Sequence, residues 1–239
     1  MTDSATVVIA ATGTPQLKDA VESVVNQTHA NTTCWVIVDG PEFAERTLAI
    51  TSQYPTVKTA VLPENTGANG FYGHRIYAAS SYMVNSDYIL WLDQDNWMLP
   101  NHVETQIKNC VERQLDWSYS LRRIHAPTGE YLLDDNCESL GRWPIFLSDQ
   151  HYLVDTSCYC VKREVIVQIG GTWYGGWGGD RQFFANISRY FPKFDTTGLH
   201  TLCYRVDGNP GSVNQDFFVQ GNAVMAQRYG EQFPWNRTE

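Results

Sequence analysis

Apolar runs that alternate with amphipathic stretches fill the first half of the chain. Four short runs of β-branched and other apolar residues predict buried strands: Thr6–Ala11, Cys34–Val38, Val57–Leu62 and Tyr88–Leu92. Between the first two runs, apolar residues recur at the spacing of one helical face, namely Leu17, Ala20, Val21, Val24 and Val25. We expect Thr14 to be the N-cap of this helix, with Pro15 in its first turn.

Three further helices are expected between and after these strands. They cover Phe43–Tyr54, the stretch from the glycine-rich turn Gly67–Gly73 to about Val84, and Asn101–Arg113 after Pro100. Strands that alternate with helices predict a mostly parallel, doubly wound sheet. Ligands of such sheets bind at the carboxyl ends of the strands. Asp39 and Asp93 each follow one of the strands, so we expect both at the same crevice.

The second half of the chain is less regular. It contains two turn-rich pieces, "HAPTGEYLLDDN" and "GTWYGGWGGDRQ", and a strand-like run at Tyr152–Val161. We expect a mixed extension of the same sheet, with a boundary near residue 115 that separates residues 1–115 from residues 116–239. The segment Tyr204–Phe217 is rich in Gly, Asn, Pro and Ser and predicts a mobile loop, which we expect to close over a bound ligand.

Paired acids end the fourth predicted strand, in "YILWLDQDNWMLP". Asp93 and Asp95 are separated by one residue on a turning chain, so both carboxylates can reach one hard cation. Mg²⁺ and Mn²⁺ prefer oxygen ligands and commonly bridge protein carboxylates to diphosphate oxygens. A D-x-D triplet alone is common and could be a solvated turn, but its place directly after a buried strand favours a metal site.

Composition and charge narrow the range of partners. The 239 residues are 43% hydrophobic and 13% aromatic, and the aromatics include 8 Trp and 13 Tyr. Such side chains suit a core, and also stacking on carbohydrate or on a base. The net charge of −9 argues against a nucleic-acid partner, because phosphate-backbone binders carry a basic face. Only local pairs such as Arg122-Arg123 are basic.

The six cysteines and the N-terminal sequence bear on location. No C-x-x-C pair occurs, which argues against a zinc ribbon and favours the buried thiols of a cytoplasmic protein. The opening "MTDSATVVIAATG" lacks the basic and long apolar regions of a signal peptide. No apolar run approaches the length of a membrane span. We therefore expect a cytoplasmic protein without a transmembrane segment.

Three segments together resemble family 2 glycosyltransferases with the GT-A fold. They are "VESVVNQTHANTTCWVIVDG", "YILWLDQDNWMLPNHVE" and "GTWYGGWGGDRQFFANI". The resemblance is strong over about residues 5–115 and patchy to about 215. It implies a Rossmann-like, mostly parallel sheet flanked by helices, with a mixed extension on the acceptor side. Residues 1–115 would be the nucleotide-sugar-binding half and residues 116–239 the acceptor-binding half of one GT-A domain.

The resemblance also implies a donor site for a nucleotide-sugar, and the family pattern leads us to expect a UDP-sugar. Ala11 and Thr12 would line the nucleotide, and Asp39 would accept a hydrogen bond from the base. Arg75, which follows the turn at Asn65, would face the diphosphate or the ribose.

Metal and acceptor residues follow from the same resemblance. Asp95 would bind Mn²⁺ or Mg²⁺, Asp93 would contact the ribose or the metal, and His200 would be a further metal ligand. Asp180 would be the general base that activates a hydroxyl acceptor, such as a glycan, in an inverting transfer. Asp180 could instead be a helix N-cap.

Trp177 and Trp173 could stack on an acceptor sugar or pack in the core. The chain also departs from the family pattern. The usual P-T-Y/F-N after the first strand is replaced by Ala10-Ala11-Thr12-Gly13, and the Glu that usually precedes the catalytic Asp is replaced by Gly179. The spacing from Asn65 to Arg75 is longer than usual.

Alternatives remain open at this point. A retaining GT-A transferase would not need Asp180 as its base. A haloacid-dehalogenase-type phosphatase also carries D-x-D after an apolar strand, although usually on the first strand. A nucleotidyltransferase shares a similar sheet, but "AATGTPQLK" lacks its Gly-rich basic signature. A degenerate transferase that only binds carbohydrate is the fourth alternative.

Overall fold

The computed structural model describes residues 3–206, 213–230 and 232–236. Its strands are β1 (Ala5–Ala11), β2 (Thr32–Val38), β3 (Lys58–Val61), β4 (Tyr88–Asp93), β5 (Trp97–Met98), β6 (Trp117–His125), β7 (Tyr131–Asp134), β8 (Tyr159–Lys162) and β9 (Phe194–Arg205). Its helices are α1 (Leu17–Val25), α2 (Ala44–Thr51), α3 (His74–Met83), α4 (His102–Glu112), α5 (Arg163–Ile169), α6 (Gly179–Tyr190) and α7 (Gln215–Tyr229).

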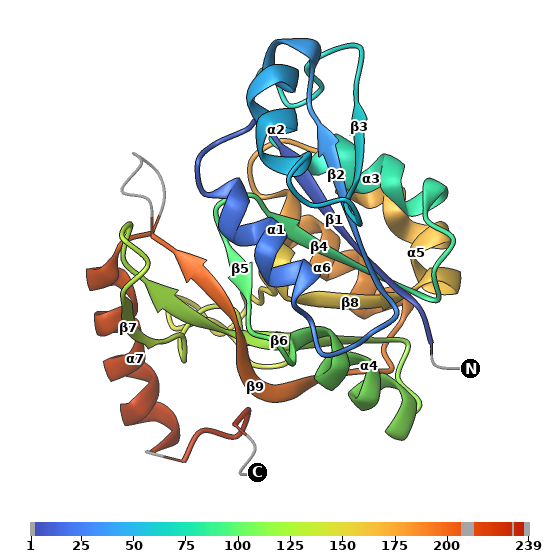
Figure 1. Ribbon diagram of the computed structural model, residues 1–239. Helices are drawn as coiled ribbons and strands as arrows, with labels where there is room; N and C mark the ends of the chain where they lie inside the picture. Colours follow the sequence, from blue (N-terminus) through green and yellow to red (C-terminus); the bar gives the residue numbers. More distant parts are fainter. Residues whose placement is uncertain (1–2, 207–212, 231, 237–239) are drawn as a thin grey trace.

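One sheet runs through the whole described chain, in the order β3-β2-β1-β4-β8-β6-β9-β5, with β7 paired to β6 (Figure 1). The strands β3, β2, β1 and β4 are parallel, as predicted for the first half. From β4 onward the sheet is mixed, because β8 is antiparallel to both β4 and β6, whereas β9 is parallel to β6. The predicted Rossmann-like sheet with a mixed extension is confirmed.

Helices cover both faces of the sheet. Helices α1 and α2 pack against β2, and α4 packs against β6, β8 and β9. On the other face, α3 contacts β1, α5 contacts β4 and β8, and α3 and α6 both contact the 3₁₀ turn Gly170–Trp173. Helix α7 lies beside β7 in Figure 1. None of the helices within the described residues is long and apolar enough to cross a membrane.

The start of the first helix differs from the prediction. Helix α1 begins at Leu17 with Gln16 in the N-cap position, and no side chain caps it. Thr14 is therefore not the N-cap. The carbonyl of Thr14 accepts a hydrogen bond from the Leu17 N–H at 3.1 Å, so the chain makes one turn before the helix starts. Among the described residues, the buried Thr14 hydroxyl has no hydrogen-bond partner.

The strand predicted at Tyr152–Val161 is shorter than expected. Only Tyr159–Lys162 forms a strand, and a 3₁₀ turn at Thr156–Cys158 precedes it. Asp155 caps this turn, because its carboxylate accepts the Ser157 N–H at 2.9 Å. Leu153 and Val154, which precede the turn, are buried without strand pairing, which explains why they resemble a strand in sequence. Of the predicted mobile loop Tyr204–Phe217, residues 207–212 lie outside the described residues.

The core is continuous across the sheet and includes an aromatic cluster under the extension. Trp91 of β4 contacts Trp173 with ring centroids 5.3 Å apart, and Trp173 stacks on Phe183 of α6 at 4.1 Å. All six cysteines are free and buried, in agreement with the expectation from the sequence. Burial raises the pKa of the Cys34 thiol and of the Cys203 thiol to about 12.

Candidate functional site

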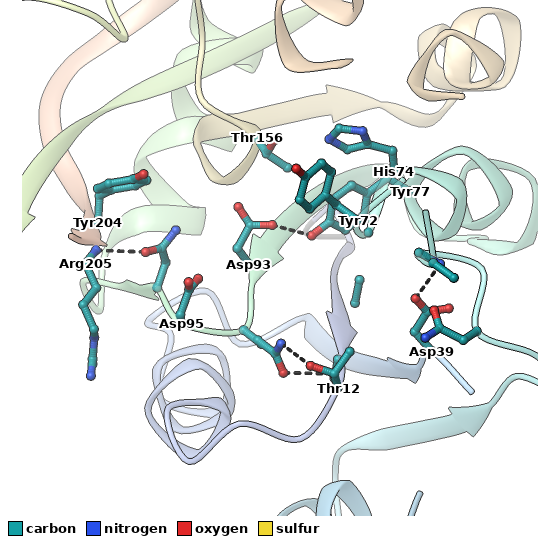
Figure 2. A pocket seen from close by; sticks show the side chains of 18 residues that line it. Thr12, Asp39, Tyr72, His74, Tyr77, Asp93, Asp95, Thr156, Tyr204 and Arg205 are labelled. Atoms are coloured by element: carbon teal, nitrogen blue, oxygen red, sulfur yellow. Dashed lines mark hydrogen bonds between the residues drawn. The ribbon is translucent and has the colours of Figure 1, made fainter. Parts of the chain in front are cut away.

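A cleft with a volume of about 500 Å³ opens at the carboxyl ends of β1, β2 and β4. Parallel strands bring these ends to one edge of the sheet, where α/β proteins bind ligands. Figure 2 shows the side chains that line it. Six residues predicted from the sequence lie together here: Ala11, Thr12, Asp39, Asn65, Asp93 and Asp95.

Gln94 joins the turn after β4 to the loop after β1. Its side-chain oxygen accepts the Thr12 N–H at 2.9 Å, and its amide donates to the Thr12 hydroxyl at 2.8 Å. The same oxygen accepts the Thr14 N–H at 3.4 Å. The residue between the paired acids therefore fixes the loop that the sequence assigned to the nucleotide.

Asp39 is buried and holds the turn on the far side of the cleft. One carboxylate oxygen accepts the Thr66 N–H and hydroxyl, both at 2.7 Å, and the other accepts the Gly67 N–H at 2.8 Å. A Cβ at Gly67 would lie 2.3 Å from the Tyr72 carbonyl oxygen and 2.6 Å from Asp39 Oδ2. The close approach of this turn to Asp39 therefore requires glycine.

Asp93 is held by hydrogen bonds from both sides. The Tyr77 hydroxyl donates to Oδ1 at 2.6 Å, and the Asp93 N–H donates to Ser157 Oγ at 3.1 Å. Burial, followed by the negative charges of Asp95 and Asp155, raises the pKa of the Asp93 carboxyl to about 7. Asp93 is therefore a buried carboxyl with two further acids, Asp95 and Asp155, close by.

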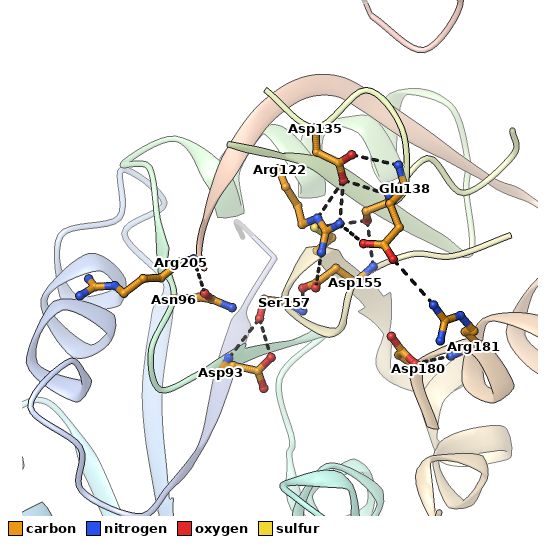
Figure 3. A network of polar contacts seen from close by, with 12 residues as sticks. Asp93, Asn96, Arg122, Asp135, Glu138, Asp155, Ser157, Asp180, Arg181 and Arg205 are labelled. Carbon is orange, nitrogen blue, oxygen red and sulfur yellow. Dashed lines mark hydrogen bonds and ion pairs between the residues drawn. The ribbon is translucent and has the colours of Figure 1, made fainter. Parts of the chain in front are cut away.

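A buried ion cluster supports this side of the cleft (Figure 3). Arg122 of β6 has a side chain only 2% exposed and pairs with Asp135 at 2.8 Å, Glu138 at 2.7 Å and Asp155 at 2.9 Å. Asp155 in turn accepts the Ser157 N–H, and Ser157 contacts Asp93. Hydrogen bonds therefore connect the core of the second half to the paired acids.

A smaller pocket of about 220 Å³ adjoins the cleft and contains Asp180 and Trp177. It shares Asp93, Tyr72, His74, Thr156 and Tyr204 with the larger cleft. Asp180 is in the first turn of α6, whose N-cap is Gly178 in a left-handed conformation (φ 82°). The N-cap interpretation of Asp180 is therefore wrong. Trp177 is 77% exposed.

Three predicted site residues lie elsewhere. Trp173 is fully buried in the aromatic cluster, so it cannot stack on an acceptor. Arg75 lines neither pocket; its guanidinium stacks 3.4 Å from the Phe71 ring centroid and donates to the Thr66 carbonyl.

His200 also lines neither pocket. Its imidazole lies 3.9 Å from Asp134 of β7, on the part of the sheet where β7 and β9 flank β6. The structure thus places the His200 side chain beside β7 rather than among the residues that line the cleft of Asp93 and Asp95.

Several residues that line the cleft were missed in the sequence. Tyr204 and Arg205 end β9, far along the chain from Asp93. The Asn96 side chain accepts the Arg205 N–H at 3.0 Å, and Arg205 pairs with Asp19 at 2.8 Å. Only the pairing of β9 with β5 and β6 brings these residues to the site, and that long-range pairing leaves no local signal.

The donor atoms of the cleft fit a hard divalent cation that a ligand helps to hold. Asp93 and Asp95 supply carboxylate oxygens, the ligands that Mg²⁺ and Mn²⁺ prefer. Among the described residues, no group of three His, Cys, Asp or Glu side chains could hold a metal on its own. A pair of carboxylates suits Mg²⁺ or Mn²⁺ when phosphate oxygens and water complete the coordination.

Solved structures of other proteins share the fold of this chain. The chain is similar to residues 1–349 of TarS from S. aureus in complex with UDP-GlcNAc, with a TM-score of 0.66 and 12% identity over 94% of this chain and 65% of that one. Another structure of TarS 1–349 gives a TM-score of 0.64 and 11% identity, over 84% and 60%. Whole TarS gives 0.64 and 11%, over 98% and 44%. The chain thus spans less than two thirds of the length of these proteins, and the fold is that of GT-A glycosyltransferases.

The family model for glycosyl transferase family 2 matches residues 6–146, more than half of the chain. The chain belongs to this family. Membership excludes the haloacid-dehalogenase-type phosphatase and the nucleotidyltransferase as alternatives. The comparison with curated protein sequences finds no significant match.

Proposed function

We propose that the chain transfers a sugar from a UDP-sugar to a hydroxyl acceptor, such as a glycan, in a metal-dependent and inverting reaction. One observation carries this proposal: the pocket of Asp180 opens into the cleft of the paired acids, and the two share Asp93. Group transfer needs a donor site and an acceptor site that meet at the reacting atoms.

Three residues of the cleft are placed to contact a nucleotide. Thr12 and Asn65 line it from the loops after β1 and β3, and Asp39 lies between them. Asp39 accepts three hydrogen bonds, and an ionised carboxylate has about four acceptor sites. One site therefore remains for a donor such as N3–H of uracil. Structures of TarS in complex with UDP and UDP-GlcNAc make a uridine nucleotide the first donor to test.

Asp95 and Asp93 would hold a Mn²⁺ or Mg²⁺ ion, which when bound would supply Lewis-acid stabilisation of the departing diphosphate. Burial, followed by the negative charges of Asp95 and Asp155, raises the pKa of Asp93, and a cation bound here would relieve the repulsion between these acids. Tyr77 and Ser157 keep the Asp93 carboxylate oriented toward the cleft by their hydrogen bonds.

Asp180 would take the proton of the attacking hydroxyl. It lies in the adjoining pocket, so a hydroxyl beside it would approach the sugar from the side opposite to the diphosphate, and such an attack inverts the anomeric carbon. A general base of this kind typically contributes a factor of roughly 100 to 10,000 to the rate.

Trp177 would bind the acceptor. Its ring is largely exposed at the pocket of Asp180, where a planar apolar surface suits one face of a sugar ring. The six free, buried thiols fit the reducing environment of the cytoplasm, which is the location that we propose.

The test compares Asp180→Asn with the wild type in two assays. We expect the variant to lose turnover of the best UDP-sugar by roughly 100-fold or more and to bind UDP with MnCl₂ as the wild type does, measured by calorimetry. Asp149→Asn is the matched control, because this exposed carboxylate makes a surface ion pair with Arg228 and lines neither pocket. Near-normal turnover in Asp180→Asn would exclude it as the base, and product analysis by NMR would separate inversion from retention.

A further inference from the structure

His74 stands at the junction of the two pockets. It is the first residue of α3 and lines both the cleft of the paired acids and the pocket of Asp180. Figure 2 shows it near Tyr72 and Tyr77. The family resemblance assigned no role to this residue, and the proposed function above does not use it.

The hydrogen-bond geometry fixes which ring nitrogen carries the proton. Nδ1 of His74 lies 2.9 Å from the carbonyl oxygen of Gly175. A carbonyl only accepts, so Nδ1 donates, and Nε2 of the neutral ring is then an acceptor. No other hydrogen bond of this side chain occurs within the part of the chain that the structure describes.

Gly179 leaves the space that the His74 imidazole occupies. A Cβ at Gly179 would lie 2.7 Å from both Nδ1 and Cε1 of His74. The ring is also confined by the Trp173 ring, whose centroid lies 5.8 Å away. A side chain at position 179 would therefore displace the imidazole. The departure Gly179 noted in the sequence, where the pattern leads one to expect Glu, gives the imidazole this space.

The position of His74 selects its ligand. His74 lines both the cleft of the paired acids, where the diphosphate would bind, and the pocket of Asp180, where the acceptor hydroxyl would bind. The sugar being transferred must occupy the space between these two groups. Its hydroxyls need acceptors when they leave water, and an unprotonated Nε2 is one.

We propose that His74 is a specificity-determining residue that binds the sugar of the donor, with Nε2 accepting a hydrogen bond from a sugar hydroxyl. The inference rests on the proposed function and adds the contact that would distinguish one UDP-sugar from another. The bond to Gly175 orients the ring, and Gly179 leaves room for it.

Two substitutions separate the two ring nitrogens. In His74→Asn the amide can replace Nδ1 and keep the bond to Gly175, but it does not reach the position of Nε2. In His74→Gln the amide reaches the position of Nε2 and loses the bond to Gly175. The assay measures kcat and KM for the UDP-sugar that the wild type hydrolyses fastest with MnCl₂, out of UDP-glucose, UDP-galactose, UDP-GlcNAc and UDP-GalNAc, together with the Kd of UDP itself.

We expect His74→Asn to lose kcat/KM by roughly 5- to 100-fold, the effect of leaving the sugar hydroxyl of the bound donor without its acceptor, and His74→Gln to lose much less. The Kd of UDP should stay unchanged in both. Full activity in His74→Asn would overturn the inference, because the residue would then only anchor the Gly175 loop. Equal losses in both variants, or no loss in either, would overturn it too.

A second pair of variants tests whether a side chain at position 179 displaces the His74 imidazole. Gly179→Ala should reproduce the loss seen in His74→Asn, whereas Gly171→Ala is the matched control, since a Cβ there meets only the Tyr82 hydroxyl at 3.6 Å. Wild-type kinetics in Gly179→Ala would refute the claim that the His74 imidazole needs glycine at position 179. If the wild type binds no UDP with MnCl₂, the proposed function itself fails, and that result differs from every outcome above.

Discussion

The buried position of His102 leads us to expect that the free energy of unfolding falls in mild acid. It is the first residue of α4 and fully buried, with Nδ1 2.9 Å from the Thr201 hydroxyl and Nε2 3.0 Å from the Gln106 side-chain nitrogen. That nitrogen also donates to the Cys158 carbonyl at 3.0 Å, so it is an amide donor. Nε2 of His102 must then be an unprotonated acceptor.

The magnitude follows from the pKa. Burial lowers the pKa of His102 from 6.5 to about 4. Below pH 6.5 the His102 imidazole is therefore mostly protonated in the unfolded chain, whereas in the folded protein it stays mostly neutral down to about pH 4. The stability that this neutral ring contributes is fully present above pH 6.5 and is lost as the pH falls. The expected loss is about 2 kcal/mol at pH 5 and about 3 kcal/mol at pH 4.

Urea denaturation measures this loss directly. We would follow unfolding of the wild type, His102→Asn and the control His151→Asn, whose side chain is exposed, at pH 8, 6 and 5. His102→Asn is less stable at pH 8, but its free energy of unfolding should fall by about 2 kcal/mol less than that of the wild type between pH 8 and pH 5. Parallel losses in the wild type and His102→Asn would refute the reasoning.

Four further predictions follow from the site. Gly67→Ala should weaken UDP binding about tenfold or more by calorimetry, because its Cβ would clash with the Tyr72 carbonyl. Arg122→Met should lower the free energy of unfolding in urea by roughly 3–5 kcal/mol, since it leaves three buried carboxylates without their cation. Trp177→Ala should raise the KM for the acceptor while the melting temperature stays unchanged, as the side chain is exposed. Asp95→Asn should abolish the dependence of UDP binding on MnCl₂, measured by calorimetry.

Specific results would contradict these expectations. Unchanged UDP affinity in Gly67→Ala would show that the turn can move away from Asp39. A stable Arg122→Met variant would mean that the carboxylates of the cluster are protonated in the folded protein. A change in melting temperature for Trp177→Ala would indicate packing rather than acceptor binding, and full metal dependence in Asp95→Asn would place the ion elsewhere.

The first half of the fold was predictable because its signals are local. Alternating apolar strands and helical stripes place β1 to β4 within a few residues of their observed bounds. Parallel topology then brings Thr12, Asp39 and Asp93 to one edge without any knowledge of side-chain contacts. The position of Asp95 at the same edge was predictable because it follows Asp93 by two residues.

The remaining features depend on contacts between distant segments. Arg122 belongs to a basic pair that suggests an exposed surface, yet it is buried because carboxylates from three other positions surround it. Trp173 and Trp177 are four residues apart in one glycine-rich segment, and nothing in their composition tells the core residue from the exposed one. The predicted N-cap of α1 was wrong for a related reason. Thr14 is a residue type that helix N-caps favour, but its carbonyl closes a separate turn before the helix.

The buried thiols offer a way to observe motions of this enzyme fold. Cys34 lies in β2, Cys160 in β8 and Cys203 in β9, so three of the six thiols report on separate strands of the sheet. A water-soluble alkylating reagent can attack such a thiol only while the surrounding segment is transiently open. Labelling rates at each cysteine, read by mass spectrometry with and without a nucleotide, would therefore rank the strands by how often they open and reveal which of them a ligand holds shut.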